Sequence, residues 1–313
     1  MDLSLFLEEV KMKKIPVMID TDPGVDDFFC LAVGSSFPEI IDLKAVSTIG
    51  GNNYTSVTTR NALDILHLFH RDDVEVAAGE TSFLTEPFGE PVAKFHGANG
   101  IGDVEIEHTT KKEADIKGSE MIYKVAKENA GELILVPVGP LTNIARVILD
   151  HPDVVTMIKK IVLMGGSITR GNITPYAEAN IGHDVPAADI VFKSGIPIDM
   201  VGLNVTLASP LPREVFDPMC EGCDKTISDT VKALIDFRKG EPMHDAVAIS
   251  SLIDETLTFR KARVTIELDG EKRGQTVADF DAPDEEKNVR VAVEVHLDRY
   301  YGVIDRVINS YTA

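Results

Sequence analysis

The amino-acid sequence predicts an α/β protein with a mostly parallel sheet flanked by helices and a small antiparallel extension near the C-terminus. Three observations support this fold class. Short apolar runs alternate with helical stretches over most of the 313 residues, as in βαβ units. Glycines and polar residues follow at the ends of these runs. Close to the C-terminus the pattern changes to alternating apolar and polar residues, which is typical of antiparallel strands.

The parallel strands are expected at runs rich in Val, Ile and Leu, because a strand covered on both faces is apolar along its whole length. Two stretches between these runs favour helices, and in the first of them Val57, Leu63, Leu66 and Phe69 recur close to a 3.6-residue period. The expected strands are residues 15–19, 41–47, 133–138, 160–164 and 198–202, and the expected helices are residues 56–69 and 119–129.

The C-terminal segments differ in character from the rest of the chain. Residues 264–268 and 288–295 alternate apolar and polar side chains, so we expect an exposed antiparallel pair there, with the charged segment 281–287 as a loop between them. No internal repeat or low-complexity linker divides the chain. We therefore expect a single domain over residues 12–313, preceded by an N-terminal extension, residues 1–11, of unknown role.

The composition is that of a soluble protein with an acidic surface, since 44% of the residues are apolar, 26% are charged and the net charge is −20. Such a charge repels nucleic acid and anionic membranes, so neither is an expected partner. No run approaches the ~18 consecutive apolar residues of a membrane span, and the acidic N-terminus lacks the basic start of a signal peptide. Three cysteines cannot form a disulfide framework, and we therefore expect a cytoplasmic protein.

The most informative segment is an acidic cluster directly after the first predicted strand, residues 15–19. Asp20, Asp22, Asp26 and Asp27 place four carboxylates within eight residues. Like charges at this density repel one another unless a cation neutralises them or one carboxyl group holds a proton. The simpler interpretation is an acidic turn that leads into a helix, since Asp26 and Asp27 favour a helix start.

Polar residues also follow the other predicted strands. Asn52 comes after a Gly-Gly pair at the end of the second strand, and Asn143 follows the third. Because the carboxyl ends of parallel strands share one edge of a sheet, these residues indicate a ligand site at that edge. Farther along, Asn172, Glu178 and Asn180 offer donors and acceptors suited to hydroxyl groups. A loop built on Asx-turns is the simpler interpretation of these three.

His244 and Asp245 form a further pair at the start of an apolar stretch, where a helix N-terminus with Asp245 near the cap is the simpler interpretation. The candidate metal ligands of the chain are carboxylates and backbone carbonyls, hard oxygen donors that suit Ca²⁺ or Mg²⁺. Zinc would need Cys or several His at short spacing, which the chain lacks. An EF-hand is excluded, because position twelve counted from Asp20 is Leu31.

Taken together, these segments resemble the inosine–uridine preferring nucleoside hydrolase family. They are Ile-Asp-Thr-Asp-Pro-Gly-Val-Asp-Asp27, Gly-Gly-Asn52, Val-Pro-Val-Gly-Pro-Leu-Thr-Asn143, Val-Leu-Met-Gly-Gly166, Asn172 with Glu178-Ala-Asn180, and His244-Asp245. They follow the family's order over nearly the whole chain. The resemblance implies a Rossmann-like α/β domain that hydrolyses the N-glycosidic bond of ribonucleosides to ribose and free base in nucleoside salvage. It also implies one Ca²⁺ as cofactor and a homo-oligomer, a dimer or a tetramer.

The resemblance further implies the metal ligands. Asp22 would bind Ca²⁺ and act as general base for the attacking water, and Asp27, Asp245 and the backbone carbonyl of Val138 would complete the ligand set. The position of Val138 is usually Thr in the family, but a carbonyl ligand does not depend on its side chain. Cleavage passes through an oxocarbenium-like sugar, which a carboxylate-rich pocket stabilises.

The ribose would be held by five polar side chains, according to the resemblance. Asp26 and Asn180 would bind the 2′- and 3′-hydroxyl groups. Asn172 and Glu178 would reach the 5′-hydroxyl group, and Asn52 would line the ribose pocket. All five belong to the segments that follow predicted strands.

On the base side, the resemblance places Met164 beside the sugar and His96 and His244 next to the base. A histidine can donate a proton near neutral pH, so His244 is the candidate acid, whereas His96 could equally be an ordinary loop histidine. The purine-specific branch of the family stacks tryptophans on the base, and this chain has none. A broad inosine–uridine enzyme or a pyrimidine-preferring one is therefore expected.

Two alternatives remain. The first is a non-catalytic Ca²⁺-dependent nucleoside- or ribose-binding protein, although every acid that hydrolysis needs is present. The second is a phosphatase of the haloacid-dehalogenase type, whose first motif is also Asp-x-Asp after a strand. Pro23-Gly24 and the His244-Asp245 pair fit a phosphatase poorly.

Overall fold

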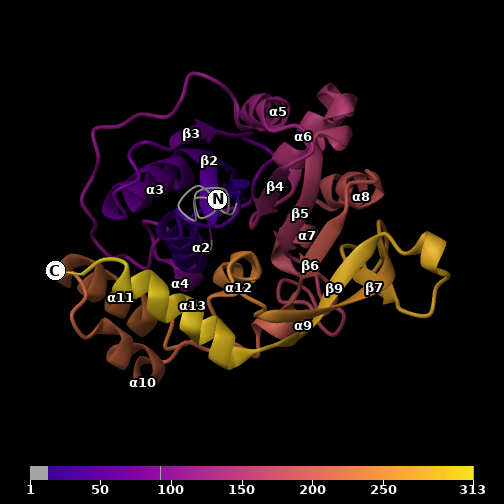
Figure 1. The fold of residues 1–313 in the computed structure, drawn as a ribbon. Helices are drawn as coiled ribbons and strands as arrows, with labels where there is room; N and C mark the ends of the chain where they lie inside the picture. The colour runs from indigo at the N-terminus through magenta and orange to yellow at the C-terminus, as the bar shows by residue number, and fades with distance from the viewer. Residues whose placement is uncertain (1–12, 92, 313) are drawn as a thin grey trace, which may run out of the picture.

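The computed structural model describes residues 13–91 and 93–312, so the expected N-terminal extension, residues 1–11, lies outside the described residues (Figure 1). A nine-stranded sheet with the order β3-β2-β1-β4-β5-β6-β9-β7-β8 runs through the molecule. Its strands are β1 Ile15–Thr21, β2 Ile41–Thr48, β3 Glu75–Ala78, β4 Leu133–Pro137, β5 Ile158–Met164, β6 Ile198–Val201, β7 Leu257–Ile266, β8 Thr276–Asp279 and β9 Val289–Val295.

The predicted fold class is confirmed. Strands β3, β2, β1, β4, β5, β6 and β9 pair in parallel, and β7 pairs antiparallel with both β9 and β8. The helices are α2 Val25–Ser36, α3 Thr55–Leu68, α4 Ala93–His96, α5 Gly118–Glu128, α6 Thr142–Asp150, α7 Ala179–His183, α8 Val185–Lys193, α9 Leu203–Thr206, α10 Arg213–Phe216, α11 Lys225–Phe237, α12 His244–Ser250 and α13 Leu297–Asn309. Short 3₁₀ turns span Pro152–Thr156, Asp217–Cys220 and Asp284–Glu286.

The prediction of an antiparallel pair near the C-terminus is correct for β7 and β9 but wrong in one respect. Strand β9 is not an exposed partner of residues 264–268, because it lies between β6 and β7 and is parallel to β6. Its residues Val289, Val291 and Ala292 are buried. Residues 263–266 of β7 pair instead with β8, a strand that the alternating pattern did not reveal.

Helices cover both faces of the sheet, and two apolar cores result. Helices α2, α3, α11, α12 and α13 pack on one face, and α5, α6 and α8 pack on the other (Figure 1). The alternation of strands and helices along the sequence therefore gives the doubly covered parallel sheet that it predicts. Within the part of the chain that the structure describes, none of the helices combines the length and apolar character that a bilayer crossing needs.

Strand β1 lies at the point where the sheet changes direction. The chain runs from β1 outward to β2 and β3 and then crosses back to β4 on the other side of β1, so the strand order reverses at this point. The loop that leaves β1 therefore opens at a topological switch point, where α/β proteins bind ligands. This loop carries the acidic cluster, and it enters α2 at Val25.

Candidate active site

The turn from β1 to α2 is organised by the carboxylate of Asp27. Its Oδ2 accepts the backbone N–H of Gly24 at 2.9 Å, and its Oδ1 accepts the N–H of Asp22 at 3.2 Å and the hydroxyl of Thr21. The expected helix start is therefore present, since Asp26 and Asp27 lie in the first turn of α2. The same bonds fix the turn, so that Asp22 and Asp26 are held beside Asp27.

Asp22 is enclosed between the ends of β1, β2 and β4. Only 2% of its surface is exposed, and its Oδ2 accepts the N–H of Asn52 at 2.7 Å. A Cβ atom at Gly51 or at Gly139 would collide with this carboxylate, so the glycines after β2 and β4 allow both loops to close around it. Its other oxygen, Oδ1, is buried without a partner among the described residues. An ionised oxygen in that position calls for a ligand or a proton.

The side chain of Asn52 ties the cluster together. Its Nδ2 lies 3.1 Å from the carbonyl oxygen of Asp22 and 3.1 Å from Oδ2 of Asp27. Asn52 therefore bridges two of the acids, in addition to lying where the ribose pocket is expected.

Three carboxylates converge at the centre of the site. Oxygens of Asp26, Asp27 and Asp245 lie within 4.8 Å of one another, and all three residues are buried. Asp245 comes from the first turn of α12, which packs against α2 (Figure 1). The family resemblance predicts that Asp22, Asp27 and Asp245 bind the metal. In the structure, the third carboxylate close to Asp27 and Asp245 is that of Asp26. Asp22 adjoins this group through Asn52.

The electrostatics of this acid cluster favour a bound cation. Burial and the neighbouring carboxylates raise the pKa of Asp27 to about 7 and raise the pKa values of Asp22 and Asp245 well above the usual range. Asp22 and Asp26 each keep one oxygen that has no hydrogen-bond partner within residues 13–91 and 93–312. Buried, mutually repelling oxygen donors with free lone pairs are the donor set that a hard divalent cation requires, so the residues present fit Ca²⁺.

Asp26 behaves differently from its neighbours. Burial by itself would raise its pKa, but the nearby His96, Arg238 and His244 outweigh burial and lower the pKa below its ordinary value. Asp26 therefore stays ionised at neutral pH. Arg238 was not among the site residues expected from the sequence. Its position, six residues before His244 in an otherwise acidic site, could have indicated a role.

The ends of β4 and β5 meet at Asn180. Its Nδ2 lies 2.8 Å from the carbonyl oxygen of Val138, 3.0 Å from the carbonyl oxygen of Met164 and 3.5 Å from the sulfur of Met164. The structure therefore brings the predicted carbonyl ligand, the predicted sugar contact and a predicted hydroxyl-binding amide into one cluster. A carbonyl oxygen has two lone pairs, so Val138 can accept from Asn180 and still face a cation.

Glu178 is the N-cap of α7, and it is almost completely buried. Its carboxylate accepts the backbone N–H groups of Gly166 at 2.8 Å, Asn180 at 3.0 Å and Ile181 at 3.2 Å. Burial nevertheless raises its pKa to about 7. Asn172, by contrast, is exposed on the turn before Glu178, and its backbone N–H donates to the carbonyl of Ala177. The structure thus buries Glu178 next to Asn180 and leaves the side chain of Asn172 exposed to solvent.

Two histidines flank Asp26. The Nδ1 atom of His96 accepts the N–H of Val25 at 3.2 Å and lies 3.9 Å from Oδ1 of Asp26. Because Nδ1 is an acceptor, the proton of the neutral ring is on Nε2. Burial lowers the pKa of His96 to about 4, so this ring is neutral at pH 7. His244 lies with Nδ1 2.7 Å from the hydroxyl of Thr206, and burial lowers its pKa as well.

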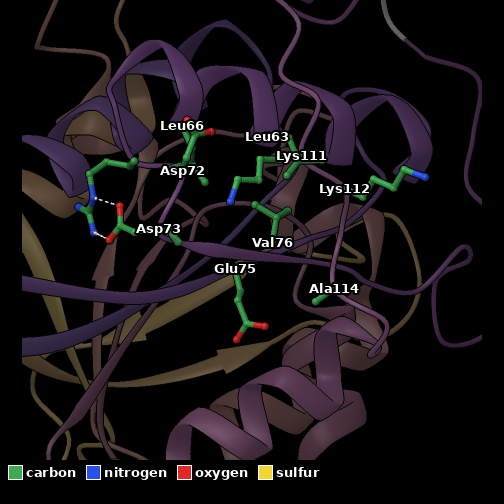
Figure 2. A pocket seen from close by; sticks show the side chains of 11 residues that line it. Leu63, Leu66, Asp72, Asp73, Glu75, Val76, Lys111, Lys112 and Ala114 are labelled. Atoms are coloured by element: carbon green, nitrogen blue, oxygen red, sulfur yellow. Dashed lines mark hydrogen bonds and ion pairs between the residues drawn. The ribbon is translucent and has the colours of Figure 1, made fainter.

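A separate hollow of about 200 Å³ lies at the β3 edge, between α3 and residues 111–114 (Figure 2). Asp73, labelled in Figure 2, forms an ion pair with Arg71, in which Nε of Arg71 lies 2.9 Å from Oδ1 of Asp73. None of its lining residues belongs to the acid cluster. The chemistry of the molecule is therefore concentrated at the carboxyl edge of the sheet.

The fold and this site define an α/β protein whose buried acids and amides gather at the carboxyl edge of a parallel sheet. The chain belongs to the inosine-uridine preferring nucleoside hydrolase family, whose sequence profile matches residues 17–302. This confirms the predicted family and enzyme class, and the chain is a ribonucleoside hydrolase. The phosphatase alternative is set aside.

Individual relatives differ in the bases that their names give. The chain is 34% identical to the pyrimidine-specific ribonucleoside hydrolase RihA of Photobacterium profundum over 95% of this chain and 99% of the relative. It is 35% identical to the non-specific ribonucleoside hydrolase RihC of Salmonella paratyphi C, over 91% and 94%. Among solved structures, a purine-preferring ribonucleoside hydrolase from Gardnerella vaginalis superposes with a TM-score of 0.88 at 32% identity, over 94% of this chain and 98% of that one.

Proposed function

We propose that this ribonucleoside hydrolase depends on Ca²⁺, held by the carboxylates of Asp22, Asp27 and Asp245 and by the carbonyl oxygen of Val138. The observation that carries the proposal is the buried acid cluster, in which no side-chain cation offsets Asp22, Asp27 or Asp245 among the residues described. A bound cation would neutralise these acids and lower the pKa of a coordinated water.

Asp22 is the proposed general base. Its Oδ1 is buried and has no partner, so one lone pair is available to take a proton from the attacking water. Its Oδ2 is held by the N–H of Asn52, which fixes the direction of the carboxylate. A base that is oriented before the substrate binds needs no rearrangement during the reaction.

The ribose is proposed to lie against Asp26, Asn52, Glu178 and Asn180, with Asn172 reaching in from its exposed turn. Asp26 is supported by its lowered pKa, because an ionised carboxylate both accepts hydroxyl hydrogen bonds and stabilises the positive charge that develops on the sugar. Glu178 and Asn180 are supported by their burial and their fixed positions at the start of α7.

The leaving base is proposed to lie between His96 and His244, with Met164 beside the sugar. His244 is the proposed acid that delivers a proton to the base. Burial lowers its pKa, which leaves the ring mostly neutral at pH 7 but makes its protonated form a stronger proton donor, and the hydroxyl of Thr206 orients the ring. His96 is fixed by the N–H of Val25 and offers its Nε2–H as a donor. We propose an inosine- and uridine-type preference, which is supported by the absence of Trp and leaves open whether pyrimidines are favoured.

Three further properties are proposed. A cytoplasmic location in nucleoside salvage is supported by three cysteines that are free thiols. A single domain over residues 12–313 is supported by the continuous nine-stranded sheet. A homo-oligomer, either dimer or tetramer, is supported by family resemblance, and light scattering would test it.

The test is ribose release from inosine and from uridine, with Ca²⁺ and after chelation, compared with two variants. We expect release only with the cation, and a loss of about 10³-fold or more in Asp22→Asn, as for removal of an essential base. Asp229→Asn makes the same chemical change at an exposed carboxylate on α11 and should retain full activity. Nucleoside binding without ribose release would instead support the non-catalytic binding protein. Release that survives chelation would contradict the Ca²⁺ dependence.

A further inference from the structure

Arg238 is a buried arginine at the base end of the site. It caps the C-terminus of α11, six residues before His244, and its side chain is only 9% exposed. The turn that follows is sharp, because Lys239 and Gly240 both have positive φ values. Gly240 is needed here, since a Cβ atom would approach the Cα of Pro212 to 2.8 Å. The backbone therefore holds the arginine in place.

The guanidinium of Arg238 is only partly satisfied. Its Nη1 donates to the carbonyl oxygen of Phe95 at 3.2 Å, and its Nη2 lies 3.2 Å from the exposed carboxylate of Glu241. Its Nε is buried and has no hydrogen-bond partner among the described residues. A buried cation with unused donors is costly unless a ligand completes its hydrogen bonds.

The position of Arg238 links the two segments that carry the histidines. The bond to Phe95 joins the turn before α12 to α4, so Arg238 connects the segment that carries His96 with the segment that carries His244. Burial is the main reason why the pKa values of both histidines are lowered, and the charge of Arg238 lowers them further; it also contributes to the lowered pKa of Asp26, so Arg238 acts electrostatically on all three groups. These are the groups that flank the proposed position of the leaving base.

We propose that Arg238 determines base specificity by donating hydrogen bonds to an oxo oxygen of the leaving base. The inference rests on the proposed function. When the C1′–N bond breaks, its electron pair leaves with the base, and the base then takes a proton from His244, the proposed acid. The oxygen of water bonds to C1′, and its proton passes to Asp22. A guanidinium keeps its proton at any pH of interest, so Arg238 acts as a fixed cation that stabilises the departing charge.

This role discriminates between bases by their functional groups. Inosine and uridine present an oxo oxygen at the ring position where adenosine and cytidine carry an amino group. Arginine has donors and no acceptor, so it pairs with the oxo group and leaves the amino group unpaired. A buried donor that faces another donor loses binding energy. Arg238 therefore favours inosine over adenosine and uridine over cytidine.

The experiment compares kcat/KM of Arg238→Met and Arg238→Lys with wild type on the four nucleosides and on a p-nitrophenyl riboside. We expect Arg238→Met to lose about 10- to 100-fold on inosine and uridine, as for loss of a hydrogen bond to a charged donor. The kcat/KM on adenosine and on cytidine should fall much less, so the preference for inosine over adenosine and the preference for uridine over cytidine both become smaller. The aryl riboside should hardly change, because its leaving group departs without help. Arg238→Lys should retain part of the preference.

Arg213→Met is the matched control, since Arg213 also bonds to α11, through Asp236 at 2.8 Å, and is partly exposed. It should match wild type on all substrates. Equal losses of Arg238→Met on all five substrates would show a positioning role through Phe95 and would overturn the inference. Unchanged nucleoside ratios would also overturn it. Failure of the wild-type enzyme to release ribose from any nucleoside would instead contradict the proposed function itself.

Discussion

Buried carboxylates at opposite edges of the same sheet differ in whether cationic side chains pair with them. Near the amino ends of the strands, Asp199 of β6 is buried and bonds to Lys160 of β5 at 2.7 Å and to Arg290 of β9 at 2.9 Å. At the carboxyl ends, Asp22 and Asp245 are equally buried, and among the described residues neither forms an ion pair with a side chain.

The difference shows which buried charges serve the fold. A structural carboxylate is paired by the chain itself, because an unpaired buried charge costs several kcal/mol. The acids at the carboxyl edge lower the stability of the metal-free protein in this way, and a bound cation would remove the penalty. Buried acids at a switch point that no cationic side chain of the described residues offsets therefore mark the ligand site, whereas Asp199 marks a strand junction.

The largest expected effect separates activity from stability at the carboxyl edge. Asp245→Asn should lower kcat/KM about 10³-fold, because a proposed metal ligand and its charge are lost. In the absence of metal the variant should be more stable than wild type by about 1 kcal/mol, since one member of a repelling group becomes neutral. Activity assays with Ca²⁺ test the first effect, and thermal melts after chelation test the second. A metal-free variant less stable than wild type would refute the repulsion argument.

A second prediction concerns the pH dependence of stability. Burial raises the pKa of Glu178 from 4.5 to about 7, so the folded state binds this proton more tightly than the unfolded state does. Stability of the metal-free protein should therefore fall as pH rises from about 4.5 to about 7, with a contribution from Glu178 of about 3 kcal/mol. Above that window the contribution is constant.

Glu178→Gln isolates the titration, because an amide does not titrate; its NH2 group replaces one oxygen that accepts from the backbone, so the variant should be less stable at every pH but with a changed pH slope. Denaturant melts between pH 4.5 and 8 should show a smaller slope for Glu178→Gln than for wild type. Glu128→Gln changes an exposed residue of α5 and should keep the wild-type slope. Identical slopes for wild type and Glu178→Gln would contradict the raised pKa.

The sequence predicted the parts of the site that are local in the chain. The acidic cluster after β1 and the polar residues after β2, β4 and β5 were visible because parallel strands place their carboxyl ends together. Which acids approach most closely was not visible. Asp26 joins Asp27 and Asp245 because α12 packs on α2, more than two hundred residues away in sequence. The role of Arg238 is hidden for the same reason.

The missed strands have a similar explanation. Strand β3 has four residues, too few to show a period, and β8 is as short. Strand β9 alternates like an exposed strand because charged side chains occupy its outward positions, and they can interact with residues of the neighbouring strands. Arg290, for instance, stacks over Phe259 of β7 and bonds to Asp199. Alternation therefore indicated the antiparallel neighbour β7 correctly and gave no sign of the parallel neighbour β6 on the other side of β9.

The smallest expected effect lies at the amino edge and completes the comparison. Asp199→Asn leaves Lys160 and Arg290 without their shared carboxylate, but both cations are partly exposed and regain water, so we expect a loss of about 2 kcal/mol of stability. Activity and the stabilisation by Ca²⁺ should both remain, because this residue lies at the opposite edge from the site. Urea melts and ribose release measure the two. A loss of activity in a folded Asp199→Asn would show that the two edges are coupled, and the division between structural and ligand-binding acids would then be wrong.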